Sequence, residues 1–239
     1  MTTNGKLHEV TFGSQRIAFA LEFRDRERLA INVHPDRTVT VVAPNGRSVQ
    51  EVVDRVQKRA GWIVKQRAYF DQFHPLTPPR RFVAGETHFY LGRQYRLKLV
   101  EDAKTSVKLK GRFLWVHLPD RADAARIELL LDQWYRDHAE PIFARRLDEC
   151  LRSARSLNVE RPELTIRKMV KRWGSCTKGG RILLNTELVK TPPYCIEYVI
   201  MHELCHLRLH DHSPEFYRLL ARCMPDWEQR KRRLECFIL

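Results

Sequence analysis

The residues His202-Glu203-Leu204-Cys205-His206 form an H-E-x-x-H pattern within a segment of helical periodicity. Histidines four positions apart lie on one face of a helix, so both imidazoles can bind one metal ion. Glu203 stands beside them and can accept a proton from water on that metal. The stretch therefore predicts a helix that carries the chemistry of a metal-dependent hydrolase.

The flanking sequence predicts the limits of this helix. Thr191 is expected to cap its N-terminus, with Pro192 at the first helical position, and the helix is expected to run to about His210. Glu203 falls on the apolar stripe of the helix, where a carboxylate without a partner costs free energy. A metal centre nearby would supply that partner. The stripe consists of Ile196, Val199, Ile200 and Leu207.

Two further histidines, His210 and His212, are candidates for a third ligand. On an unbroken helix His210 would lie about 12 Å along the axis from His202, too far to share its metal. Ser213-Pro214 starts a new helix, so the chain must turn before it and can bring His212 back. We predict His212 as the third ligand, beside the two histidines of the H-E-x-x-H pattern. Three imidazoles with an open fourth position favour one catalytic zinc per chain, with another divalent metal as the alternative.

The segment Lys171-Arg172-Trp173-Gly174-Ser175 precedes a Gly-rich turn, and we expect it to end a strand over 164–176 in a hairpin beside the metal. The free edge of such a strand can pair with an extended peptide. Its five residues are therefore candidates for substrate binding, and Lys171 or Arg172 for stabilising an oxyanion. The alternative is an ordinary hairpin with Trp173 in the core.

The chain is strongly basic, with 43 Lys and Arg against 29 Asp and Glu and a net charge of +14. Such a charge attracts nucleic acid, nucleotides or acidic proteins, although a solubilising surface has the same composition. One alternative function is thus a nucleotide pyrophosphohydrolase acting on nucleoside triphosphates, and the basic residues of 167–172 favour it. Against it, phosphoryl chemistry usually uses magnesium on carboxylates. A second alternative is a nucleic-acid-binding protein with a structural metal, although a structural zinc has four protein ligands.

The distribution of β-branched runs and helical periodicity predicts an α+β protein. Residues 1–120 are expected to form a β-rich N-terminal region with one long helix over 49–73, which Ser48 and Glu51 begin as a capping box. Residues 121–239 are expected to form the metal-binding catalytic domain. Its first helical stretch, about 121–157, contains Pro141, which should kink or split it. No internal repeat is evident.

Other features concern the compartment and the partners. No apolar run reaches about 18 residues, so no membrane span is expected. The first residues lack the apolar stretch of a secretory signal. The six cysteines form no C-x-x-C pair and favour a reducing cytoplasm. The expected partners are a peptide or nucleotide substrate, and the basic charge allows nucleic acid nearby; nothing indicates the oligomeric state.

Several motifs together resemble the YgjP-like metallopeptidase family, which is related to the SprT-like zincins. The resemblance implies a zincin-like minidomain and a zinc-dependent hydrolase, with His202, His206 and His212 as ligands and Glu203 as general base. It leaves peptide and nucleotide substrates open, since some members are thought to be pyrophosphatases. The DNA-linked role of SprT-like relatives does not carry over, because the chain lacks an obvious extra DNA-binding module. The matching segments are 31–44, 61–63, 172–176, 198–206, 212–216 and 225–226, with Asn185 and Leu188, so the resemblance covers nearly the whole chain.

Overall fold

The structure is a computed structural model that describes residues 6–34, 36–71, 80–170, 172–177 and 179–237. Its contacts divide the chain into two compact units, Met1–Pro78 and Pro79–Phe237. The first unit is β-rich, and the second combines two sheets with four of the α-helices. The predicted α+β class is confirmed.

The first unit is a four-stranded sheet with one helix packed on it. The strands lie in the order β1-β2-β4-β3, and β2 and β4 run parallel. The predicted capping box begins the helix: Glu51 N–H donates to Ser48 Oγ at 3.2 Å, and Ser48 N–H donates to Glu51 Oε2 at 3.3 Å. The elements are β1 (Lys6–Phe12), β2 (Gln15–Arg24), β3 (Ala30–Val33), β4 (Val39–Pro44) and α1 (Val49–Asp71).

The second unit begins with another four-stranded sheet of the same topology. Its order is β5-β6-β8-β7, and β6 and β8 run parallel as β2 and β4 do. Each sheet is followed by a long helix, so the chain repeats one arrangement that the sequence did not reveal. Strand pairing depends on which positions are apolar and not on which apolar residues fill them. Two sheets can therefore share a topology without sharing sequence. The strands are β5 (Thr87–Tyr90), β6 (Arg93–Glu101), β7 (Ser106–Lys110) and β8 (Phe113–Leu118).

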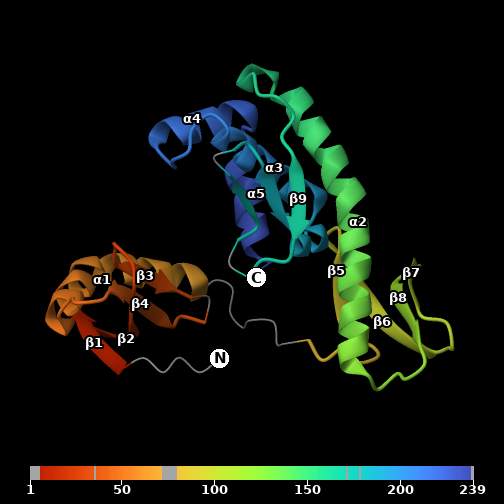
Figure 1. The fold of residues 1–239 in the computed structure, drawn as a ribbon, viewed down its shortest axis with the longest axis horizontal. Coiled ribbons are helices and arrows are strands. Elements are labelled where there is room, and N and C mark those ends of the chain that lie inside the picture. Colours follow the sequence, from red (N-terminus) through yellow and green to blue (C-terminus); the bar gives the residue numbers. More distant parts are fainter. Residues whose placement is uncertain (1–5, 35, 72–79, 171, 178, 238–239) are drawn as a thin grey trace. The chain divides into compact units, whose positions relative to one another are not determined.

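The division between units differs from the expected boundary at residue 120. Leu97 of β6 and Val116 of β8 belong to the same hydrophobic cluster as the buried residues of the C-terminal helices. The reason is α2, which contacts β7 and β8 as well as the segments that follow it (Figure 1). The second sheet therefore belongs with the half of the chain that contains the H-E-x-x-H pattern.

The rest of the second unit consists of helices around a three-stranded sheet. Pro141 lies inside α2 and does not split it. The stretch expected as one strand forms two, β9 and β10, which pair with opposite sides of β11. No helix among the described residues is long and apolar enough to cross a membrane. The elements are α2 (Ala124–Ser153), η1 (Arg155–Leu157), β9 (Leu164–Arg167), β10 (Gly174–Cys176), β11 (Ile182–Asn185), η2 (Thr186–Lys190), α3 (Pro193–His206), α4 (Pro214–Cys223) and α5 (Trp227–Glu235).

The helix with the H-E-x-x-H pattern is shorter than expected at both ends. Thr191 does not cap it, because the Thr191 hydroxyl donates to Leu188 O at 2.8 Å in the preceding 3₁₀ turn. At the other end α3 stops at His206 rather than near His210. The backbone N–H groups of Arg208 and Leu209 both bond to Cys205 O at 3.0 Å, a tightened last turn that redirects the chain.

Candidate metal centre and active site

Three imidazoles meet at the C-terminal end of α3. The Nε2 atom of His202 lies 3.1 Å from that of His206 and 3.0 Å from that of His212, and the latter two are 3.2 Å apart. Among the described residues, these three form the group of side chains able to hold a metal ion. His210 is exposed and is not part of this group.

The separations match the coordination of a small tetrahedral cation. With bonds of about 2.0–2.1 Å, tetrahedral zinc separates its nitrogen ligands by about 3.3 Å. The observed 3.0–3.2 Å between the Nε2 atoms of His202, His206 and His212 is close to that value. Three nitrogens leave a fourth position for water or substrate. The residues present therefore fit a catalytic zinc.

The protonation and orientation of the imidazoles also suit a metal. His206 Nδ1 lies 3.0 Å from Leu209 O, so it donates its proton there and leaves the Nε2 lone pair for a ligand bond. Burial, with the charges of the neighbouring imidazoles, lowers the pKa of His202 to about 3. Burial also lowers the pKa of His212. Both rings are thus neutral at pH 7, which metal binding requires.

The Glu203 side chain is buried beside the three imidazoles, with 5% of its surface exposed. Burial raises the pKa of its carboxyl to about 7. The positive charge of Arg172 and a hydrogen bond from the backbone of Cys176 oppose that rise. The groups that act on Glu203 thus lie on β10, at Cys176, and just before that strand, at Arg172. Both residues are far from Glu203 in the sequence.

Gly174 lies where strand β10 meets helix α3. A Cβ atom at this position would lie 2.7 Å from Glu203 Oε1, 2.8 Å from Val199 Cγ1 and 3.0 Å from Glu203 Cγ. Real Cβ atoms do not approach other atoms this closely, so any other residue at this position would displace the carboxylate or the strand. Gly174 was predicted as a substrate-binding residue, and the structure places it against the catalytic candidate itself.

Of the other predicted substrate-binding residues, Ser175 lies on β10, and Arg172 and Trp173 directly precede that strand. Lys171 is outside the described residues. Arg172 is exposed, and its Nη1 lies 3.5 Å from Ser175 Oγ. Trp173 is half-buried and packs on the hydrophobic core, as the alternative for this residue expected. Strand β10 is at the edge of its sheet, so one side of its backbone is not paired within that sheet.

Asn185 was not among the predicted site residues, yet it holds the loop before β10. Its Nδ2 donates to Met169 O at 2.7 Å and to Arg172 O at 2.9 Å. Its Oδ1 accepts from Met169 N and Glu187 N, both at 3.2 Å. The side chain is fully buried. The available signal was a polar residue directly after the apolar run of β11, where an amide needs several partners to be buried.

Phe216 was also missed as part of the site. This fully buried ring of α4 packs beneath the three imidazoles, with centroid distances of 4.9 Å to His202, 4.5 Å to His206 and 5.1 Å to His212. Helix α4 begins where predicted, since Ser213 Oγ accepts from Phe216 N at 3.4 Å. The start of α4 thus fixes the position of the Phe216 ring, against which the three imidazoles pack.

Comparison with known proteins shows the family of the chain. The model of the YgjP-like, metallopeptidase domain family matches residues 27–236. The chain belongs to this family. The membership supports a metal-dependent peptidase and implies a metal ion in this YgjP-like chain. No curated protein matches the chain.

Two solved structures resemble part of this YgjP-like chain. One is the metallopeptidase zymogen abylysin of Pyrococcus abyssi, with 22% identity over 38% of this chain and 90% of that one, and a TM-score of 0.35. The other is the metallopeptidase zymogen jannalysin of Methanocaldococcus jannaschii, with 22% identity over 38% and 92% of the two chains, and a TM-score of 0.33.

Proposed function

We propose that this YgjP-like chain is a zinc metallopeptidase in which Glu203 is the general base. One observation carries the proposal: the Nε2 atoms of His202, His206 and His212 lie 3.0–3.2 Å apart, beside the buried Glu203 carboxylate. Imidazoles of this number and spacing favour zinc over magnesium or calcium, which prefer oxygen ligands.

The three histidines would hold the metal through Nε2, and Leu209 O fixes the orientation of His206. The chemistry that zinc supplies when bound is that of a Lewis acid, which polarises a carbonyl and makes water easier to ionise. Glu203 accepts the proton of the attacking water on a carboxylate oxygen and passes it to the leaving amine. Its hydrogen bond from the Cys176 backbone and the nearby charge of Arg172 orient the carboxylate for both transfers.

The substrate we propose is a peptide in extended conformation along β10. This strand is at the edge of its sheet, and backbone hydrogen bonds to an edge strand bind peptides with little regard to sequence. Gly174 and Ser175 lie on the strand, and Trp173 and Arg172 precede it. Arg172 is exposed and acts on Glu203 through its charge, so it is our candidate for stabilising the oxyanion.

The donor set favours this proposal over the two alternatives. Nucleotide pyrophosphohydrolysis usually needs carboxylates that hold magnesium, whereas the group able to hold a metal among the described residues is made of imidazoles. A structural zinc would need a fourth protein ligand, and the same group offers three. The peptidase also follows from the family to which the chain belongs.

The decisive comparison is between the native protein and Glu203→Gln, assayed with zinc on a dye-labelled unfolded protein. The variant keeps the shape of the side chain and removes its basicity, so turnover should fall on the order of 100-fold or more while the bound metal stays. Glu228→Gln is the control, because Glu228 is an exposed residue of α5. Turnover in Glu203→Gln equal to that of the control, or cleavage of nucleoside triphosphates instead of protein, would contradict the proposal.

A further inference from the structure

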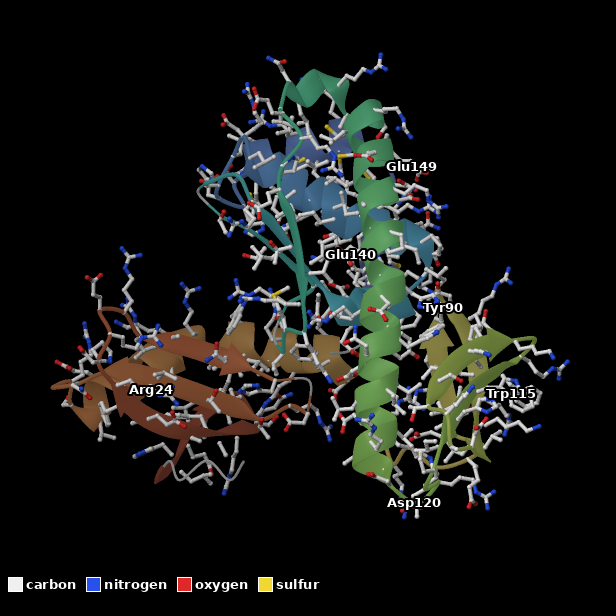
Figure 2. The ribbon with its side chains drawn as sticks, turned by 45° about the vertical axis from the view of Figure 1, so that its right-hand side comes forward. Arg24, Tyr90, Trp115, Asp120, Glu140 and Glu149 are labelled. Carbon is white, nitrogen blue, oxygen red and sulfur yellow. The ribbon has the colours of Figure 1, made fainter. Side chains whose placement is uncertain are left out.

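The outer face of the β5–β8 sheet carries a row of aromatic side chains that the peptidase site does not use. Strand β8 alternates in burial: Leu114, Val116 and Leu118 belong to the core, and the residues between them are partly exposed. These are Phe113, Trp115 and His117, which we call the aromatic row. Figure 2 shows Trp115 on the side of the sheet away from α2.

The rings of the aromatic row are evenly spaced. The centroid of Trp115 lies 6.3 Å from that of Phe113 and 6.3 Å from that of His117. The Trp115 and His117 rings are stacked with an interplanar angle of 19°. The Lys98 ammonium lies over the Trp115 ring, 3.9 Å from its centroid. The face of the indole therefore already holds a cation.

Basic residues flank the aromatic row on both neighbouring strands. On β6, Arg96 pairs with Phe113 and Lys98 with Trp115. On β7, Lys108 pairs with Trp115 and Lys110 with Phe113. Residues paired across a sheet share a face, so these four cations, which we call the basic flanks, lie beside the rings. All four are exposed.

Acidic residues are nearly absent from this part of the chain. Residues 93–117 contain seven Lys or Arg and two acidic residues, Glu101 and Asp102. Glu101 pairs with Leu118, which faces the core, and it is thus in register with the inner face. Asp102 follows β6 and pairs with His117 Nδ1 at 3.2 Å, at the end of the aromatic row. The positions that pair with Phe113 and Trp115 on the neighbouring strands are all basic. No carboxylate among them neutralises the charge of the basic flanks.

The matching sheet of the first unit shows that the topology does not require this composition. Its parallel pair β2 and β4 aligns Ala20 with Thr40 and Glu22 with Val42, on the face opposite the buried residues. They are the first two outward-facing pairs of their parallel ladder, as the pairs of Arg96 with Phe113 and of Lys98 with Trp115 are in the second sheet. The two sheets have the same topology, but only the second has rings and cations at these pairs. A ligand therefore explains this composition better than a requirement of the fold does.

We propose that the outer face of the β5–β8 sheet binds single-stranded nucleic acid. Bases would stack on the aromatic row and phosphates would bind the basic flanks, which is how sheet platforms bind single strands with little sequence preference. The site is separate from the metal centre, since its residues belong to β6, β7 and β8. The proposed binding does not depend on the proposed peptidase activity. When a base stacks on Trp115, the Lys98 ammonium would leave the ring and bind a phosphate instead.

The physical character of the face favours this partner over other polyanions. An anionic membrane is held by apolar side chains that project into the lipid, and among the described residues no large, highly exposed apolar side chain lies on β6, β7 or β8. An acidic peptide would satisfy the charges but would leave the flat faces of the rings unused. Single-stranded nucleic acid matches both features, because it alternates flat bases with negative charges.

Fluorescence anisotropy of the full chain with a labelled 20-nucleotide oligothymidylate tests the proposal. Trp115→Leu should raise Kd at least about fivefold, since stacking of one base on an aromatic ring is lost. Lys108→Glu should also raise Kd and flatten the slope of log Kd against log salt by about 0.7 or more. A duplex of the same length should bind more weakly, because its bases cannot reach the rings.

Two variants of the first unit are matched controls. Trp62→Leu removes an indole that is 40% exposed, and Lys58→Glu reverses an exposed charge on α1. Both should leave Kd unchanged. Equal effects of Lys108→Glu and Lys58→Glu would overturn the proposal, as would equal affinity for single strand and duplex. Binding of anionic lipid vesicles that responds to Trp115→Leu, without any binding of the oligonucleotide, would assign the face to a membrane instead.

Discussion

A Cβ atom on Gly174 would lie 2.7 Å from Oε1 of Glu203. Glycine at this position lets strand β10 rest directly on the buried carboxylate, and the Cys176 backbone then reaches the same carboxyl group. The strand proposed to bind substrate and the residue proposed as general base therefore hold each other in place. Two parts of the sequence almost thirty residues apart therefore meet at the proposed active site.

Gly174→Ala should lower peptidase turnover about 10- to 100-fold, because displacements of about 1 Å at a reacting group have effects of this size. The three imidazoles are not touched, so the bound zinc should remain. Turnover and zinc content are measured on the same sample. Gly179→Ala is the control, since its Cβ would meet its nearest neighbour, Thr177 Oγ1, at 4.0 Å. Full turnover in Gly174→Ala would mean that the contact does not position Glu203.

Asn185→Ala should destabilise the fold by about 1–3 kcal/mol, because it leaves the buried backbone groups of Met169 and the partly buried carbonyl of Arg172 without their partners. The free energy of unfolding in urea measures this cost. The loop before β10 should also loosen, which would raise KM for a peptide more than it lowers kcat. A change in unfolding free energy below about 0.5 kcal/mol would show that water replaces the amide.

His88 makes the stability of the second unit depend on pH. Burial lowers its pKa to about 4, and the charges of Arg80 and Lys190 act in the same direction while Glu86 opposes them. The unfolded chain takes up this proton near pH 6.5, before the folded protein does. The contribution is thus complete above about pH 6.5 and is lost as the pH falls towards 4, by at most about 3 kcal/mol.

Unfolding free energies of the native protein and His88→Gln between pH 7 and pH 5 measure this effect. Glutamine cannot take up a proton, so the variant should lose less stability on acidification. Any pH dependence that does not involve His88 is common to both proteins and cancels in the difference. Parallel pH profiles of the two proteins would show that His88 takes up its proton in the folded protein as readily as in the unfolded chain.

The parts of the site that obey local rules could be predicted from the sequence. Histidines four apart on a helix must share a face, and Ser213-Pro214 must end one helix and begin another, so the positions of His202, His206 and His212 follow from spacing. Whether they bind zinc is a prediction that the metal analysis below tests. The capping box at Ser48 followed from local chemistry in the same way.

The features that depend on tertiary contacts could not be predicted. Nothing in the sequence near Gly174 shows that Glu203 lies against it, and Asn185 reveals its role only through partners in a loop brought beside it. The end of α3 at His206 depends on a tightened last turn rather than on a proline or glycine. The division of the chain likewise depends on α2, which packs against strands that precede it.

Elemental analysis of the protein purified without a metal-affinity tag tests the central claim most directly. The native chain should contain one zinc. His212→Ala should lose it, because one of three converging Nε2 atoms is removed, and His210→Ala should retain it. The contradicting result is a native protein that contains no metal and gains no thermal stability from added zinc, or a His210→Ala variant that loses its metal while His212→Ala keeps it.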